Sequence, residues 1–224
     1  MNERVIHLVR HGEVDNPNHV VYADLPGFGL SEMGRRQAAE AGRYLEGRPV
    51  AAIVTSPLER ARETADALAA GVGVGTDRRL VEIDERLTEW LLARHWAGVA
   101  WEALAEERPG EVEAYIADPL SLRAGIEPLT TVVARVAGAV AAALERHPAG
   151  EVVLVSHQDP LQAIRLAMTG RHLAAQHTDK PGHAEVVTLS HHAPETEAPW
   201  TEIAAWRPEQ GPTFPPPPGG ATTL

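Results

Sequence analysis

Two histidines stand directly after short apolar runs that have the character of buried strands. His11 follows the run Val5 to Val9 and sits within Arg10-His11-Gly12-Glu13. His157 follows the run Glu151 to Val155. Open α/β sheets bind ligands at the carboxyl ends of their strands, and a histidine beside a fixed cation and a glycine is suited to attack on a phosphoryl group. One such motif is a weak signal, but two at comparable strand ends indicate a shared site.

An arginine follows a third apolar run, Val50 to Val54. Ser56 is a possible helix cap and Pro57 suits the first helical position, so Arg60 is expected in the first turn of the next helix. Its planar guanidinium, near the unpaired N–H groups of a helix start, could grip an anionic oxygen. A single arginine without context is more often a solvated surface residue.

The elements that must position these residues follow from the periodicity of the apolar positions. Apolar residues recur at helix spacing over Ala38 to Leu45, Leu58 to Leu68 and Val132 to Leu144, and Glu185 to Leu189 predicts a last strand. This alternation of strands and helices predicts a layered α/β fold. The first three strand-like runs could lie side by side in its sheet.

Length and composition indicate one catalytic domain and a tail. The 224 residues, 44% of them hydrophobic, suffice for one α/β domain over residues 1–192. Eight of the 18 prolines lie from Pro194 onward. Residues 193–224 are therefore predicted to form a Pro-rich C-terminal tail, extended or disordered, outside the core.

Several classes of protein are disfavoured by the same composition. The absence of cysteine excludes disulfides and thiolate chemistry. No apolar run is long enough for a membrane span, and the N-terminal sequence lacks a cleavable signal pattern, so a soluble cytoplasmic protein is expected. The net charge of −11 argues against nucleic-acid binding. The expected partner is a small phosphorylated substrate, and the oligomeric state stays open.

The remaining histidines give little support for a metal or another cofactor. His7, inside the first strand, is expected to be a packed side chain. His177, Asp179 and His183 could bind a metal at the surface, but they lack an H-E-x-x-H arrangement. Because the arginines already supply the charge that a cation would bring, no catalytic metal and no cofactor are expected.

Taken in order, these motifs resemble the histidine phosphatase superfamily, also called the phosphoglycerate-mutase-like family. The likeness covers about residues 4–190, and Leu30 to Ala38 looks like the family's usual helix after the catalytic loop. The matching segments are Val9-Arg10-His11-Gly12-Glu13, Thr55-Ser56-Pro57-Leu58-Glu59-Arg60-Ala61 with Thr64-Ala65, and Val155-Ser156-His157. The resemblance implies a three-layer α/β/α sandwich with a mixed, mostly parallel central sheet.

The resemblance also implies the roles of the matching residues. His11 would accept the phosphoryl group as a metal-independent nucleophile, forming a phosphohistidine. Arg10, Arg60 and His157 would surround the phosphoryl oxygens and offset their charge. Because His11 must attack through a neutral ring nitrogen, its other nitrogen should donate a hydrogen bond, with a nearby backbone carbonyl as the candidate acceptor.

The family uses a carboxylic acid to protonate the leaving oxygen, and two glutamates of this sequence compete for that role. Glu82 lies nearer the customary distance after Arg60. Glu89 precedes Trp96-Ala97-Gly98, which resembles the tryptophan and glycine that usually follow the acid. We favour Glu89, with Trp90 as an apolar wall that could raise its pKa, and keep Glu82 as the alternative.

Other positions depart from the family pattern. Asn16 and Asn18 both fall near the asparagine that often touches phosphate, and Gln158 replaces a common glycine. Residues 90–130 would form a cap that faces the substrate, although packing roles for the tryptophans are at least as well supported. The cap residues of interest are Arg94, His95, Trp96, Trp101 and Arg123.

Phosphomonoester hydrolysis is the leading function predicted from these residues. One alternative is phosphoglycerate-mutase-type phosphoryl transfer, which is disfavoured because the longer segments that close over a mutase substrate are missing. Another is a noncatalytic phospholigand-binding module, disfavoured because both histidines and both arginines are present. Sugar phosphates, phosphoglycerates, nucleotide-derived esters and phosphoproteins present the same phosphoryl group, so the motifs do not choose among them.

Overall fold

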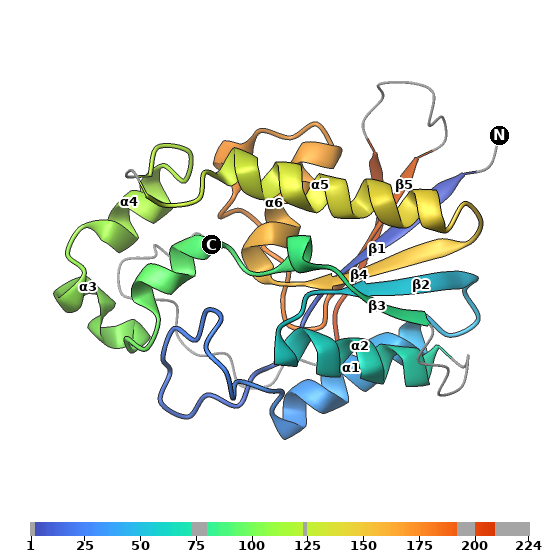
Figure 1. Ribbon diagram of the computed structural model, residues 1–224, viewed down its shortest axis with the longest axis horizontal. Helices are drawn as coiled ribbons and strands as arrows, with labels where there is room; N and C mark the ends of the chain where they lie inside the picture. The colour runs from blue at the N-terminus through green and yellow to red at the C-terminus, as the bar shows by residue number, and fades with distance from the viewer. Residues whose placement is uncertain (1–2, 73–79, 123–124, 192–199, 209–224) are drawn as a thin grey trace.

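A computed structural model describes residues 3–72, 80–122, 125–191 and 200–208 of the chain. Within these residues, six strands form one sheet in the order β3-β2-β4-β1-β5-β6 (Figure 1). Their bounds are β1 Arg4–Arg10, β2 Val50–Thr55, β3 Val81–Ile83, β4 Glu151–Ser156, β5 Val186–His191 and β6 Thr201–Trp206. The three runs expected to lie side by side do so, as β2, β4 and β1.

The sheet is mixed and mostly parallel, as predicted. β1 pairs in parallel with β4, β4 with β2, and β2 with β3. β5 runs antiparallel to both of its neighbours, β1 and β6. The shared direction of β1, β2 and β4 brings their carboxyl ends, and the residues that follow them, to one edge of the sheet.

Helices cover both faces of the sheet, which confirms the three-layer α/β/α architecture. In Figure 1, α1 (Glu32–Tyr44) and α2 (Glu59–Gly71) lie together below the sheet, and α5 (Leu129–Arg146) and α6 (Gln158–Met168) lie above it. The helical periodicities predicted from sequence fall within α1, α2 and α5. Among the described helices, none is long and apolar enough to cross a membrane.

Alternate residues of the central strands fill two separate cores. Ile6 of β1 and Leu154 of β4 belong to the cluster that contains α5 and α6 residues. Val9 and Val155, which pair with each other across the same two strands, lie on the other face and belong to the cluster that contains α1 and α2 residues. Because the side chains of a strand point alternately to its two faces, nearly continuous apolar runs are required here. This explains why the strand-like runs were visible in the sequence.

Short helices between β3 and α5 form a cap. Figure 1 shows α3 and α4 at the left, apart from the labelled strands. The cap packs through buried aromatic side chains, among them Trp90, Trp96 and Tyr115. Its elements are η2 (Glu85–Leu87), η3 (Leu91–Trp96), η4 (Trp101–Ala103), α3 (Leu104–Glu107) and α4 (Glu111–Ala117), and a further short helix, η5 (Leu173–Ala175), follows α6.

The prediction that all of residues 193–224 lie outside the core is wrong for β6. Residues 201–206 pair with β5 and extend the sheet by one edge strand. Their side chains alternate between exposed and half-buried, which is the pattern of a strand with one face on the core. Because prolines lie on both sides of residues 201–206, the whole region was classed as Pro-rich and the short alternating pattern was not recognised. Residues 192–199 and 209–224 lie outside the described part of the chain.

Candidate active site

His11 stands immediately after β1, held by the backbone on both sides. Its N–H donates to the Ser156 carbonyl at 3.0 Å, and its carbonyl accepts from the Ala184 N–H at 3.2 Å. The ring is buried, and its Nδ1 donates to the Gly12 carbonyl at 2.7 Å. Burial, together with Arg60, His157 and Arg10, lowers the pKa of His11 well below its usual value. The ring is therefore neutral, with the lone pair on Nε2.

Two glycines allow the His11 loop to pack directly on α1. A Cβ on Gly12 would lie 2.5 Å from the Gly34 carbonyl oxygen, and a Cβ on Gly34 would lie even closer to backbone atoms of Glu13. The glycine after His11 thus serves an approach of backbone to backbone. Ser31 caps α1 through its Oγ and also donates to Glu13 Oε1 at 2.7 Å. The start of α1 therefore fixes the His11 loop in place.

Arg60 lies in the first turn of α2, as predicted, but the helix begins later than expected. α2 starts at Glu59 with Leu58 at the N-cap position, so Pro57 is not its first residue. Ser56 Oγ accepts from the Leu58 N–H at 3.3 Å ahead of the helix. Arg60 is only 1% exposed, and its guanidinium lies 4.6 Å above the centre of the Tyr22 ring. A buried cation in this position needs an anion or aromatic partner.

A cavity of about 520 Å³ borders Arg60 on its outer side. Apart from Arg60 and Arg62, its charged lining residues are acidic, and its apolar lining includes Phe28 and Leu58. Carboxylates repel a phosphoryl dianion at this range. The phosphoryl group is therefore expected beside the neutral rings of His11 and His157 and the Arg10 guanidinium, and not among these carboxylates.

His157 follows β4 and occupies the N-cap position of α6. Its ring is fully buried, with the ring centre 5.2 Å from that of His11. Nε2 lies 2.8 Å from Ser56 Oγ. Burial, followed by Arg60 and Arg10, lowers the pKa of His157 well below its usual value. The ring is neutral and presents Nδ1 toward the same site.

Arg10, the last residue of β1, is gripped by the loop that precedes β5. Its Nη1 donates to the Pro181 carbonyl at 3.1 Å, and its Nη2 lies 2.9 Å from His183 Nε2. Burial and the Arg10 charge lower the pKa of His183 to about 2, so that ring is neutral and accepts the bond. Gln158, in place of the family's glycine, donates to the same Pro181 carbonyl at 3.2 Å.

The site contains buried donor atoms without partners among the described residues. They are Arg10 Nε, Arg60 Nε and, in the tautomer in which Nε2 accepts from the Ser56 hydroxyl, His157 Nδ1. Buried donors are normally satisfied, and leaving one unpaired costs on the order of 1–3 kcal/mol. Several such donors around His11 form a cradle for an anion with multiple acceptor oxygens, and a phosphoryl group has this property.

Glu89 borders this cradle. Its Oε2 lies 4.0 Å from His157 Nδ1, and its Oε1 accepts from the Trp90 N–H at 2.7 Å. Burial and the nearby Asp159 raise the pKa of Glu89 to about 7, against the opposing effects of Arg60, the Trp90 N–H and Arg10. Trp90 therefore contributes an N–H that favours the ionised form, while burial and Asp159 favour the protonated one.

The loop that carries Glu89 is held by α5. Arg135 donates to the carbonyls of Arg86, Thr88 and Glu89 at 2.6, 2.8 and 3.2 Å. Ser156 Oγ donates to the Leu87 carbonyl at 2.6 Å, which ties the same loop to the end of β4. The carboxyl group is thereby presented from a fixed backbone.

Glu82, the competing glutamate, lies elsewhere. It is on β3, where its carboxylate pairs with Arg146 at 2.6 Å and His147 at 2.7 Å near the end of α5. Although burial alone would raise it, these two partners lower the pKa of Glu82. A carboxylate that stays ionised and is committed to other partners is poorly suited to donate a proton.

The two asparagines and the described cap residues are bonded to other groups, exposed, or buried in the core. Asn16 bonds both ways with the backbone of Val20, at 2.9 and 3.1 Å, and Asn18 is exposed. In the cap, Arg94 pairs with Asp24, His95 is exposed, and Trp96 is buried in the core. Trp101 is 37% exposed. Arg123 lies outside the described residues.

Sequence reasoning missed the contributions of Tyr22, Ser56, Asp159 and His183 to this site. Tyr22 lies on a loop after β1, with its ring centre 6.4 Å from that of His11. Asp159 accepts from Tyr115 and Lys180, so its charge is held beside Glu89. Asp159 could have been noted because it lies two residues after His157; Tyr22 and His183 come from loops whose path the sequence does not show.

Across residues 3–72, 80–122, 125–191 and 200–208, no group of three or more His, Cys, Asp or Glu side chains is arranged to hold a metal ion. The site's positive charge comes from Arg10 and Arg60, which are fixed components of the fold.

Comparison with known proteins agrees with this arrangement. The family model described as the histidine phosphatase superfamily (branch 1) matches residues 6–201. An uncharacterized protein of Mycobacterium tuberculosis is 39% identical over 173 residues, covering 76% of this chain and 81% of that protein. Phosphoserine phosphatase 1 of Hydrogenobacter thermophilus is 31% identical over 166 residues, covering 73% and 75%. The solved structure of a mycobacterial glucosyl-3-phosphoglycerate phosphatase, at 29% identity, superposes with a TM-score of 0.75 over 90% of this chain and 97% of that one.

Proposed function

Because the chain belongs to the histidine phosphatase superfamily, branch 1, we propose that it hydrolyses phosphomonoesters through a phosphohistidine on His11. The observation that carries this proposal is the tautomer of His11. With Nδ1–H committed to the Gly12 carbonyl at 2.7 Å, the basic lone pair lies on Nε2. The lowered pKa keeps the ring unprotonated at neutral pH. A neutral, fixed imidazole is the form that can attack phosphorus.

Arg10, Arg60 and His157 would bind the phosphoryl oxygens during this attack. Each has a buried donor atom without a protein partner among the described residues, so binding the anion removes an existing penalty. Donors fixed before the substrate arrives need no reorganisation as charge develops, which lowers the barrier. The two guanidinium groups supply the positive charge, so the proposed reaction uses no metal ion.

Glu89 would be the general acid and then the general base. A carboxyl group with a pKa of about 7 is protonated in a large fraction of molecules near neutral pH and can donate to the leaving oxygen. Once ionised, it can take a proton from water as that water attacks the phosphohistidine. The phosphoryl group then leaves as inorganic phosphate, and both His11 and Glu89 return to their starting states.

The test is phosphate release from an aryl phosphomonoester in EDTA, with acid-stopped detection of a labelled phosphoenzyme. Wild type is compared with His11→Ala and with His172→Ala, an exposed histidine on the loop after α6. We expect turnover and an acid-labile label in wild type and His172→Ala, and neither in His11→Ala. Removing a catalytic nucleophile can cost on the order of 10⁶-fold in kcat, as in a serine protease.

Three outcomes would contradict the proposal in different ways. Label without phosphate release would favour mutase-type transfer to a second hydroxyl group. Phosphate binding without label or turnover, over a panel of natural phosphomonoesters, would favour a noncatalytic phospholigand-binding module. Loss of turnover in EDTA that divalent cations restore would overturn metal independence.

The panel should begin with the two substrates that the names of relatives indicate, O-phosphoserine and a glucosylated 3-phosphoglycerate, and with 3-phosphoglycerate as the smaller ester contained in the second. O-phosphoserine, 3-phosphoglycerate and a glucosylated 3-phosphoglycerate share the phosphoryl group but differ in size and charge. An acidic protein with net charge −11 repels polyanions at low salt, so small monoesters are expected to outperform phosphoproteins. A preference for a phosphoprotein over all three small esters would contradict that expectation.

A further inference from the structure

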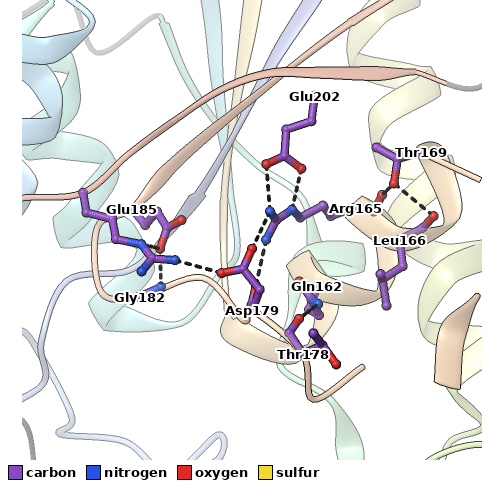
Figure 2. Close-up of polar contacts among 10 residues, drawn as sticks. Gln162, Arg165, Leu166, Thr169, Thr178, Asp179, Gly182, Glu185 and Glu202 are labelled. Atoms are coloured by element: carbon purple, nitrogen blue, oxygen red, sulfur yellow. Dashed lines mark hydrogen bonds and ion pairs between the residues drawn. The ribbon is translucent and has the colours of Figure 1, made fainter. Parts of the chain in front are cut away.

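An ion-pair cluster built around one buried arginine lies outside the proposed active site and contacts the loop that holds Arg10. Its centre is Arg165 of α6, which is only 3% exposed. Arg165 donates to both carboxylate oxygens of Glu202 on β6, at 2.8 and 2.7 Å, and to the carbonyl and carboxylate of Asp179, at 2.8 and 3.0 Å. Figure 2 shows Arg165 between these two acidic residues. We call Arg165, Asp179, Glu202, Arg207 and Glu185 the Arg165 cluster.

The second half of this cluster grips the same loop further along. Arg207, just after β6, donates to Glu185 Oε2 at 2.7 Å and to Asp179 Oδ1 at 3.1 Å. Glu185 Oε2 also accepts from the Gly182 N–H at 2.7 Å. Residues 179–185 are therefore tied at both ends to α6 and to the edge strand.

The loop needs such fixing because its backbone is strained. Asp179 and Ala184 have φ values of 52° and 50°, in the left-handed region that residues other than glycine seldom occupy, although aspartate enters it more readily than alanine. Strained residues of this kind persist only where the surrounding structure holds them, at a cost of about 1–3 kcal/mol each. The ion pairs at Asp179 supply that restraint at one of the two positions.

The two groups that hold Arg10 lie between Asp179 and Ala184. The Pro181 carbonyl accepts from Arg10 Nη1, and His183 Nε2 accepts from Nη2. Arg10 Nε has no hydrogen-bond partner among the described residues. The loop thus fixes one side of the guanidinium and leaves another donor for a ligand.

From this chain of contacts we infer that the Arg165 cluster is a positioning device for phosphate binding, which acts on Arg10 through residues 179–185. It rests on the proposed function only in taking Arg10 as a phosphate ligand. It also assigns a role in positioning Arg10 to β6, the edge strand that follows the predicted motifs in the chain. Ligand groups are held to sub-ångström tolerance by such supporting contacts.

The test measures binding of inorganic phosphate by titration calorimetry to the full-length protein. We expect Arg165→Gln and Glu202→Gln to weaken binding about threefold to tenfold, and Arg165→Lys to recover part of the loss. Arg146→Gln is the matched control, because it also breaks an arginine–glutamate pair on a helix, with Glu82, but far from the loop. It should bind phosphate as wild type does.

A second arm separates positioning of Arg10 from a general loss of structure. Arg10→Lys keeps a cation but cannot make the two directed contacts with Pro181 and His183 together. In that background, Glu202→Gln should cause little further loss of phosphate affinity, because the contacts it supports are already gone. An equal loss in both backgrounds would overturn the inference and indicate a structural role for the cluster.

The remaining outcomes also decide between explanations. If wild type binds phosphate and Arg165→Gln and Glu202→Gln bind it equally well, the inference fails while the proposed function stands. If wild type binds no phosphate, the proposed function fails, and the inference with it. If Arg165→Gln does not fold, Glu202→Gln and Asp179→Asn carry the test, since asparagine tolerates the left-handed backbone at 179.

Discussion

The polar groups at the two ends of strand β4 differ in whether they have hydrogen-bond partners. At its amino end, Glu151 accepts two bonds from Arg48, at 2.6 and 2.9 Å, and one from His7 at 2.8 Å. At its carboxyl end, buried His157 has no hydrogen-bond partner for Nδ1 among the described residues, and the same holds for the Nε atoms of Arg10 and Arg60. His7 is the packed histidine predicted from sequence, whereas His157 faces the proposed site.

The polar groups at the amino end of β4 therefore contribute to stability, and those at its carboxyl end are available for function. Although burial alone would raise it, the bonds from His7 and Arg48 lower the pKa of Glu151 to about 2, so folding is favoured by its ionised form. The donors at the other end have no such partners and are available for a ligand. A satisfied network contributes to folding, and an unsatisfied one lowers stability in exchange for binding.

The largest effect is expected from removing the acid at the carboxyl end. Glu89→Gln should lower kcat for alkyl phosphates by roughly 10²–10⁴-fold, because the leaving oxygen can no longer be protonated. For an aryl ester with a good leaving group the loss should be smaller. Steady-state kinetics on both substrate types measure this difference.

Glu82→Gln is the matched control for that experiment. Its carboxylate pairs with Arg146 and His147, so we expect kcat within about twofold of wild type and a stability change below roughly 1 kcal/mol. A leaving-group-dependent loss in Glu82→Gln, with Glu89→Gln active, would reverse the assignment of the acid.

Arg60→Met should show the next largest effect. We expect kcat/KM to fall roughly 10²–10³-fold, because a fixed donor to the transition state is lost. Removing a buried cation also removes the cost of its desolvation, which offsets part of the contacts that are lost. The thermal unfolding midpoint should therefore fall less than in Glu151→Gln; a large drop in Tm with preserved kcat/KM would contradict the division between the two ends.

Glu151→Gln should reverse that pattern. The free energy of unfolding is expected to fall by about 1–3 kcal/mol, since bonds to an ionised carboxylate are weakened, while kcat/KM stays within about twofold. Because the folded-state pKa is depressed from 4.5 to about 2, the wild-type advantage is present above pH 4.5 and is lost as the pH falls toward 2. Urea unfolding of both proteins at pH 7, 4 and 2.5 checks this; a difference that grows on acidification would be the wrong sign.

The smallest expected effect is a shift in pH dependence from Asp159→Asn. The Asp159 charge is, after burial, the second cause of the raised pKa of Glu89, so its removal should lower that pKa. If protonated Glu89 is the acid, activity falls on the alkaline side, and this fall should move to lower pH in Asp159→Asn. The pH profile of kcat for an alkyl phosphate measures the shift; movement to higher pH would exclude Asp159 as its cause.

The sequence by itself predicted the sheet centre and most of the proposed site. β1, β2 and β4 are buried on both faces, so each must be a continuous apolar run, and the residues that follow must meet at one edge. His11, Arg60 and His157 were therefore recognisable from position and type. Helices α1, α2 and α5 were visible because their buried stripes repeat at helical spacing.

Only the tertiary structure decided what depends on contacts between distant segments. The choice between Glu89 and Glu82 depends on the groups around each carboxylate, since both glutamates follow the same local sequence pattern. β6 was hidden because an edge strand with one exposed face lacks a continuous apolar run, and it is recognised by its pairing with β5. The grip of His183 on Arg10 joins residues 173 positions apart, and no local propensity encodes a hydrogen bond of that span.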